Sequence, residues 1–281
     1  MTAVQVVPLT AGECLNIKAL TERGAAWRVG HYPAGFALLL HPTFGPVLFD
    51  TGYGLAVVRA MRRWPALLYG LVTPVRLDPR DTALAQLERM GFTAQDIGHV
   101  ILSHLHADHV GGLLDFPHSR LVLDERAYAP MKPLHGLRAV RKAYLPELLP
   151  SDFGARMQPL TFRPAPPELA PFFEYADVFG DGSVLALPVA GHAAGMIALL
   201  VRVQAGAELA GDGRGWVLLA ADAAWSVRGL RLGLPVHPLA RVAFFDVQAE
   251  GRSAEQLRAW LARHPHTPVI VSHDAPELSR V

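Results

Sequence analysis

Residues 103–109 read Ser-His-Leu-His-Ala-Asp-His and bring three imidazoles and one carboxylate close together in the chain. Imidazole nitrogens and carboxylate oxygens are the atoms that most often hold zinc or iron in proteins when no thiolate is present. The apolar run 98–103 precedes this stretch and a glycine pair, 111–112, follows it, so we expect a buried strand that ends in a tight loop. The stretch therefore predicts a metal site rather than a polar loop of hydrogen-bonded histidines.

Other apolar runs in the chain also lead into an imidazole or a carboxylate. A single such residue is usually a hydrogen-bonded strand-end residue, but neighbouring strands of a sheet end at a shared edge, so several of them predict convergence. The runs are 184–189, 216–220 and 269–272, and the polar residues that follow them are His192, Asp222 and His273. Asp50 follows the apolar run 46–49, where an Asp is more often a turn or cap residue.

The remaining elements are predicted from periodicity and capping residues. We expect a hairpin of strands 36–40 and 46–49, a helix over 81–90 capped by Asp81, and further strands at 120–123 and 197–203. A capping box at 253–256 predicts a helix start, with Leu257, Trp260 and Leu261 facing inward. Residues 211–213 read as a hairpin turn, and no repeat of 20 to 50 residues is visible.

Two segments depart from this regular pattern. Residues 55–77 are apolar and basic, which fits either an amphipathic helix over the core or a wall over a substrate pocket. Residues 124–179 are rich in proline and aromatic residues, with a helical part near 137–149, and are too apolar for a free linker. We expect one domain over 1–281 that carries both segments as insertions, and a homodimer through one of them.

Composition bounds the class of protein. Hydrophobic residues make up 51% and charged residues 18%, which is typical of a packed globular chain. The 26 Lys and Arg residues balance 25 Asp and Glu residues, so we expect no nucleic-acid partner.

Cysteine content and hydropathy indicate the compartment. The single cysteine, Cys14, excludes an internal disulfide and a cysteine-rich zinc site, and it fits a reducing cytoplasm. Residues 1–9 lack the pattern of a signal peptide. The apolar stretch 64–75 is too short for a transmembrane segment and is interrupted by prolines.

The ordered motifs resemble those of the metallo-β-lactamase-fold superfamily. The matching stretches are Asp-Thr-Gly at 50–52, His-Leu-His-Ala-Asp-His at 104–109, Gly-His-Ala-Ala-Gly at 191–195, Ala-Asp at 221–222 and Ser-His at 272–273. The resemblance covers about residues 35–275 and implies an α/β (α+β) fold, a four-layer αββα sandwich with two divalent metal ions at one edge.

The resemblance also implies a role for each motif residue. His104, His106 and His192 would bind the first metal, Asp108, His109 and His273 would bind the second, and Asp222 would bridge them. Asp50 would not bind a metal itself but would orient one of the ligand side chains from behind. A ligand set of nitrogen and oxygen suits zinc, and iron, manganese and cobalt also fit. The expected chemistry is hydrolysis by a metal-bridging hydroxide, with Asp108 as the catalytic proton shuttle.

Individual residues narrow the subfamily. Flavodiiron proteins, which share this fold, carry Glu where this chain has His106, and the main zinc β-lactamase group has Cys in place of Asp222. The chain is most similar to N-acyl homoserine lactonases, which implies a small ester or lactone substrate. Those enzymes usually carry a tyrosine three residues after the bridging aspartate, where this chain has Trp225. An indole donates one hydrogen bond but cannot transfer a proton as a phenol can.

The departure at Trp225 leaves other substrates open: a thioester, an aryl ester or a phosphodiester. A non-catalytic metal-binding module is the remaining alternative, although every ligand position is filled. The substrate pocket is predicted to involve Trp64, Leu68, Tyr69 and Trp225.

Overall fold

The computed structural model describes residues 2–204 and 215–274, so the turn predicted at 211–213 lies outside the described residues. Two mixed sheets form its centre. The strands of the first, in spatial order, are β4 (Val75–Arg76), β1 (Gln5–Ile17), β2 (Val29–His41), β3 (Gly45–Phe49), β5 (His99–Ile101), β6 (Arg120–Leu123) and β7 (Met157–Pro159). Those of the second are β13 (Val269–Ile270), β12 (Trp216–Leu219), β11 (Ile197–Arg202), β10 (Val184–Pro188), β9 (Glu174–Asp177) and β8 (Arg163–Pro164).

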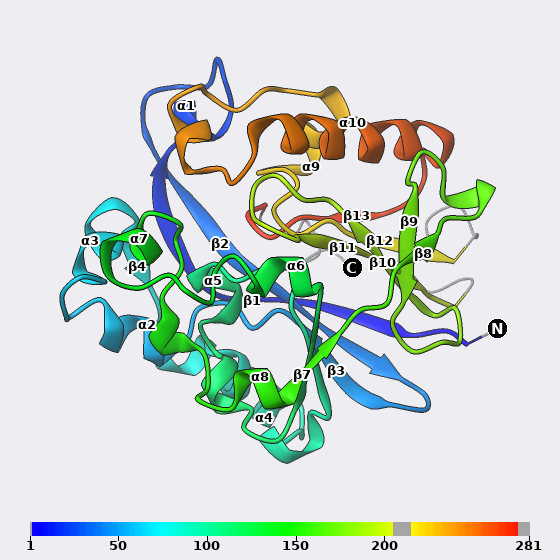
Figure 1. Cartoon of the computed structure of the whole chain (residues 1–281), viewed down its shortest axis with the longest axis horizontal. Coiled ribbons are helices and arrows are strands. Elements are labelled where there is room, and N and C mark those ends of the chain that lie inside the picture. The colour runs from blue at the N-terminus through cyan, green and yellow to red at the C-terminus, as the bar shows by residue number, and fades with distance from the viewer. Residues whose placement is uncertain (1, 205–214, 275–281) are drawn as a thin grey trace.

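Helices cover the outer face of each sheet, so the predicted four-layer αββα sandwich is confirmed (Figure 1). Those packed against the first sheet are α2 (Leu55–Ala60), α3 (Leu67–Val72), α4 (Ala83–Arg89), α5 (Ala107–Val110), α6 (Glu125–Tyr128), α7 (Gly136–Val140) and α8 (Phe153–Arg156). The second sheet is covered by α9 (Val227–Leu232) and α10 (Val247–Arg263), and α1 (Lys18–Thr21) follows β1.

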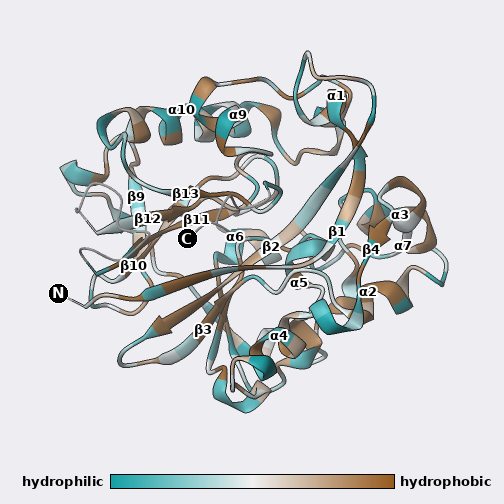
Figure 2. Ribbon diagram, turned by 180° about the vertical axis from the view of Figure 1, so that it is seen from behind, coloured by the Kyte–Doolittle hydropathy of each residue, from teal (hydrophilic) through white to brown (hydrophobic). Residues whose placement is uncertain are grey.

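Successive side chains of a strand point to opposite faces of its sheet, and this alternation produces three apolar layers. In β2, Leu39 faces the second sheet, whereas Leu38 faces the helices of the first. Leu199 of β11 lies in the layer between the sheets, and its neighbour Leu200 packs against α10. Figure 2 shows the strands that meet between the sheets largely in brown, the colour of hydrophobic residues.

The predicted hairpin of strands 36–40 and 46–49 is confirmed, because β2 and β3 pair antiparallel from Ala37–Phe49 to His41–Gly45. Strand β1 was not predicted, although it pairs with β2 over most of its length. Its sequence alternates only weakly and includes Pro8 and Gly12, which depress the strand signal.

Both predicted helix starts are wrong. Helix α4 is capped by Thr82, whose Oγ1 accepts from the Ala85 amide, and Asp81 lies in the preceding 3₁₀ turn, η1 (Pro79–Asp81). Helix α10 begins at Val247, because the Asp246 carboxylate accepts from two amides and caps it there. Ser253 lies inside α10 and donates to the Ala190 carbonyl at 2.7 Å, so the capping box does not form.

The inward face of α10 is as predicted, since Leu257, Trp260 and Leu261 are buried. The helical part expected at 137–149 is only α7 and the 3₁₀ turn η4 (Pro146–Leu148). Ala143 between them has φ of 49°, outside the helical range, and Pro146 cannot continue a helix.

The two unusual segments both contact the body of the protein. Residues 55–77 form α2, α3 and β4 rather than one helix, and they leave Trp64, Leu71 and Val72 exposed. The segment 124–179 packs on the body through buried residues that include Ala127, Phe153 and Phe172. Dimerisation through either segment stays a prediction.

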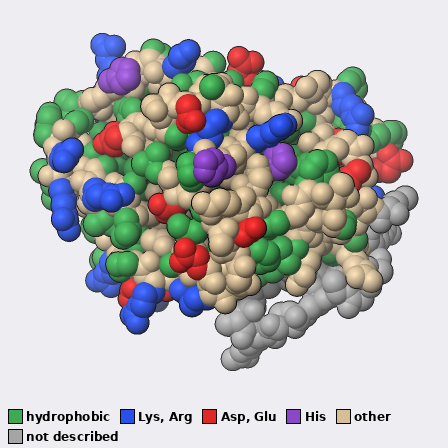
Figure 3. Space-filling view, turned by 90° about the horizontal axis from the view of Figure 1, so that it is seen from below, with side chains coloured by type: hydrophobic (Ala, Val, Ile, Leu, Met, Phe, Trp, Pro, Cys, Tyr) green, Lys and Arg blue, Asp and Glu red, His purple; other side chains and the backbone are tan. Residues whose placement is uncertain are grey.

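Charge of neither sign gathers on the face seen from below in Figure 3, where Lys and Arg side chains are interspersed with Asp and Glu. Within residues 2–204 and 215–274, every helix is too short or too polar to cross a membrane.

Leu199 is fully buried in the layer between the sheets, so we expect truncation of its side chain to destabilise the protein strongly. Leu199→Ala removes packing and leaves a cavity, so we expect a loss of about 2–5 kcal/mol in unfolding free energy, measured by urea denaturation. Leu232→Ala is the matched control, because Leu232 is 63% exposed and should change stability by less than about 0.5 kcal/mol. Equal effects of the two variants would contradict this layer assignment.

Candidate metal centre

The predicted ligands lie where strands of both sheets end. β3 runs parallel to β5, and β12 runs parallel to β13, so within each pair the carboxyl ends meet at one edge. Asp50 follows β3, the histidine motif follows β5, Asp222 follows β12 and His273 follows β13. The loop after β10 adds His192, which completes the set.

The structure brings all seven predicted ligands together in two groups. Each group has its ligand atoms within 4.8 Å of one another. The first group consists of His104, His106, His192 and Asp222, and the second of Asp108, His109, Asp222 and His273. Asp222 belongs to both groups, which is the placement predicted for a bridging carboxylate.

Asp222 lies at the centre of the cluster. Its Oδ1 is 3.2 Å from His109 Nε2, and its Oδ2 is 3.0 Å from His273 Nε2 and 3.3 Å from His192 Nε2. The preceding residue, Ala221, has φ of 47°, a conformation that costs energy for any residue with a side chain. The backbone is therefore held in an unfavourable state at the point that places Asp222 between the two groups.

Several atoms in the cluster are buried without hydrogen-bond partners among the described residues. They include Nε2 of His104, and also Nε2 of His109 and Oδ1 of Asp222, which lie 3.2 Å apart without forming a hydrogen bond. A buried polar atom without a partner costs about 1–3 kcal/mol, and a cation at the centre of each group would supply the missing interactions. The donor set of imidazole nitrogens and carboxylate oxygens also matches divalent transition metals, so the residues fit two such ions.

Hydrogen bonds behind the cluster orient the histidines. Asp50 accepts from His109 Nδ1 at 2.8 Å and from the Ser103 hydroxyl at 2.7 Å. Because that hydroxyl gives its proton to Asp50, it accepts from His104 Nδ1, 2.9 Å away. One carboxylate therefore fixes two imidazoles with Nε2 toward the centre, the orienting role predicted for Asp50.

The glycines around the histidine motif are needed because two backbone segments pass very close to each other there. A Cβ on Gly111 would lie 2.7 Å from the Gly52 carbonyl oxygen, and a Cβ on Gly54 would clash with the carbonyl of Gly111. The turn after Asp50 and the end of α5 can therefore pack together only when these residues lack side chains. This packing brings the Asp50 carboxylate to His109.

Trp225 packs against a ligand histidine. Its ring stacks on His273 with centroids 4.7 Å apart and an interplanar angle of 22°. His273 Nδ1 donates to the Pro33 carbonyl at 3.0 Å, so the imidazole is held from its edge and its face. In this structure Trp225 supports the second group of ligands.

The other predicted substrate residues lie in and around α3. Trp64 is 68% exposed, Leu68 is half-buried and Tyr69 is buried, with its hydroxyl 3.0 Å from that of Tyr53. Neither of the two cavities described next includes Trp64, Leu68, Tyr69 or Trp225 in its lining.

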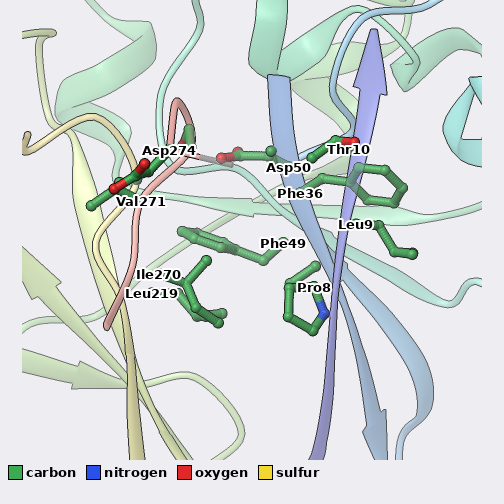
Figure 4. Close-up of a pocket in the computed structure, with 14 residues that line it drawn as sticks. Pro8, Leu9, Thr10, Phe36, Phe49, Asp50, Leu219, Ile270, Val271 and Asp274 are labelled. Carbon is green, nitrogen blue, oxygen red and sulfur yellow. The ribbon is translucent and has the colours of Figure 1, made fainter. Parts of the chain in front are cut away.

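Two cavities adjoin the site. The larger opens between the sheets and is lined by Asp50 together with apolar residues such as Phe36, Phe49 and Ile270 (Figure 4). None of the seven predicted ligands lines it. The second, which is smaller, includes His106 and His192 and therefore borders the first group.

Burial and charge divide the histidines into two protonation classes. Burial lowers the pKa of His104, His106 and His192, so all three are neutral at pH 7. Burial opposes protonation of His273 too, but Asp222 outweighs it and raises the pKa of His273 to about 9. The pKa of His109 is likewise raised well above its usual range, because Asp222, Asp108 and Asp50 together outweigh burial.

Sequence reasoning missed the hydrogen-bonding role of Ser103 and the lining of the smaller cavity. Ser103 directly precedes the motif, which is its only sequence signal. Lys142 and Phe245, which line the cavity, carry none, because they come from segments far from every motif.

Comparison with known proteins shows the family. The family model described as metallo-beta-lactamase superfamily matches residues 34–204. The chain is 28% identical to the N-acyl homoserine lactonase AttM of Rhizobium radiobacter, over 98% of this chain and 94% of that protein. It is 31% identical to a probable metallo-hydrolase of Mycobacterium tuberculosis, over 67% of this chain and 58% of that protein.

Solved structures show the same fold. The structure of an N-acyl homoserine lactone hydrolase, with N-hexanoyl-L-homoserine bound at its catalytic metal centre, matches with a TM-score of 0.74 and 20% identity. The match covers 100% of this chain and 97% of that one.

The Asp50 network predicts weaker metal binding in Asp50→Asn. An amide cannot accept all of these hydrogen bonds as a carboxylate does, so His109 and His104 lose their fixed orientation. We expect zinc affinity to fall about 10- to 100-fold, measured by competition with a chelating dye. Asp78→Asn, at the cap of η1 and outside both ligand groups, should leave the affinity unchanged. Unaltered zinc affinity in Asp50→Asn would contradict this role.

The protonation classes predict that metal binding releases protons. At pH 7.5 the metal-free chain holds a proton on His273, whose pKa is about 9, and metal must displace it. The apparent affinity should therefore rise as the pH approaches 9 and weaken as it falls. Zinc titration in weak buffer with a pH indicator should show release of at least about one proton per chain. If zinc binding released no protons, the assignment of a protonated His273 in the metal-free chain would be wrong.

Proposed function

The chain belongs to the metallo-beta-lactamase superfamily and is a metal-dependent hydrolase, and we propose that it opens the ester bond of a lactone or a simple ester at a centre of two metals. The observation that supports this most strongly is the convergence of seven ligand side chains in two groups that share Asp222. One shared carboxylate between two complete groups is the arrangement expected for paired cations.

We propose zinc as the metal. Every ligand offers nitrogen or oxygen, and Cys14 belongs to neither group. Iron, manganese and cobalt suit the same ligands, so the donor set narrows the choice to borderline divalent metals. Bound there, such metals supply an activated water near neutral pH and polarise the carbonyl under attack.

The protein's own residues hold the ligands and move a proton. Asp50 and Ser103 keep Nε2 of His104 and His109 directed inward. Asp108 is assigned as the proton shuttle, because its Oδ2 lies 3.5 Å from His273 Nε2 and its side chain is 10% exposed. A carboxylate at that position can take a proton from the attacking water and deliver it to the leaving alkoxide.

The relatives suggest the substrate class, and Trp225 restricts which group can protonate the leaving group. AttM, which matches nearly the whole chain, is an N-acyl homoserine lactonase, and this makes a lactone the first substrate to test. Trp225 stacks on His273 and offers no hydroxyl, so any proton for the leaving group must come from elsewhere, for which Asp108 is suited.

Other hydrolase substrates, such as aryl esters, thioesters and phosphodiesters, form the second candidate class, because the same ligand set can serve them. A non-catalytic module is disfavoured by the completeness of the ligand set.

The test is metal content measured together with hydrolysis of an N-acyl homoserine lactone, an aryl ester and a phosphodiester. We expect about two metal ions per chain and hydrolysis of the lactone that stops on chelation and returns with zinc. Turnover of the ester or phosphodiester alone would contradict the lactone assignment.

His106→Ala and Asp108→Ala should each lower hydrolysis of whichever substrate is used by more than about 100-fold, since each removes a ligand. Glu88→Ala, on the exposed face of α4, is the control and should keep full activity. Full activity in either ligand variant would refute the metal mechanism.

A further inference from the structure

The smaller cavity adjoins the first group of ligands and is formed by residues from five parts of the chain. His106 and His192 form one side of it. Its other lining residues include Ala127, Met131, Lys142, Ala193, Ala194 and Phe245. Alanines make up much of the wall, so small apolar methyl groups border the opening beside the metal ligands.

The cavity is tied to the ligand loops by backbone hydrogen bonds. The Ala107 amide, inside the histidine motif, donates to the Ala143 carbonyl at 3.0 Å, directly beside Lys142. The Phe245 amide donates to the His192 carbonyl at 3.1 Å. The positions of Lys142 and Phe245 are therefore fixed relative to His106 and His192.

Lys142 is the only Lys, Arg, Asp or Glu among the residues that line the cavity. Its Nζ donates to the Phe244 carbonyl at 3.4 Å and lies 5.4 Å from the centre of the Phe245 ring. Among the described residues no carboxylate lies within ion-pair distance of it. An ammonium has three donors, so this one retains capacity for an anionic partner.

The local sequence around Lys142 is uniformly basic. Residues 131–145 contain Lys132, Arg138, Arg141 and Lys142 and no Asp or Glu. Like charges gathered on one segment attract anions and raise their local concentration. This field would oppose a cationic substrate at the same opening.

We propose that this cavity binds a carboxylate on the acyl part of the substrate, with Lys142 as its counter-ion. The proposal rests on the proposed function and deepens it: the substrate class becomes a lactone or ester whose acyl group ends in an acid. The scissile carbonyl would lie at the ligand cluster, the acyl carbons along the alanines, and the terminal carboxylate at Nζ. Lys142 is thus a specificity-determining residue.

The kinetic test compares two lactones whose acyl groups have equal numbers of carbon atoms, N-glutaryl- and N-pentanoyl-homoserine lactone. Lys142→Met keeps most of the length of the side chain but removes its charge. We expect kcat/KM for the glutaryl substrate to fall about tenfold, mainly through KM, and that for the pentanoyl substrate to change less than about twofold. Arg263→Met, an exposed cation at the end of α10 outside both the lining and residues 131–145, should change neither value.

The second readout is calorimetric binding of glutarate and pentanoate to the metal-loaded protein. Both acids can reach the ligand cluster, but only glutarate has a second carboxylate for Nζ. Lys142→Met should weaken glutarate about tenfold and leave pentanoate unchanged.

Equal losses for both substrates, or unchanged glutarate binding, would overturn the role of Lys142 while leaving the hydrolase assignment intact. If wild-type protein hydrolyses neither lactone nor any ester, the proposed function itself fails.

Discussion

The whole site depends on the burial of Asp222 among imidazoles. A carboxylate removed from water is stable only when cations or hydrogen-bond donors surround it. Here the imidazoles of His273 and His109 hold the pKa of Asp222 well below its usual range, although burial alone would raise it. The same carboxylate is the one side chain common to both ligand groups, so its position sets the position of both.

The sandwich architecture serves to make this burial possible. Both sheets contribute strand ends, and packing between them brings His104 and Asp222 together from opposite sheets. The glycines at 54 and 111 allow the turn after Asp50 to contact the end of α5. Asp50 then holds two histidines from behind, so the rigid core of the first sheet extends directly into the metal site.

The site could be predicted from the sequence because its ligands follow strong local patterns. The histidine motif, and a polar residue after each apolar run, are visible without any tertiary information. The helix starts at α4 and α10 could not be predicted, because several Asp, Ser and Thr residues compete as caps and small energies decide among them. Strand β1 was missed because its pairing with β2, rather than its own pattern, stabilises it.

The residues around the ligands were the least predictable. Lys142 reaches the cavity from a segment with no motif, and its importance depends on contacts with Phe244 and Phe245, about a hundred positions away. Trp225 was predicted to face the substrate, yet its stacking on His273 depends on where β12 and β13 end relative to each other. Such long-range contacts leave no periodic signal in the chain.

The central claim is that two cations bind side by side and share Asp222. Anomalous X-ray diffraction from crystals of the zinc-loaded protein tests it most directly. We predict two peaks per chain, one among His104, His106 and His192 and one among Asp108, His109 and His273, about 3.5–4 Å apart. A single peak, or peaks away from Asp222, would contradict the account.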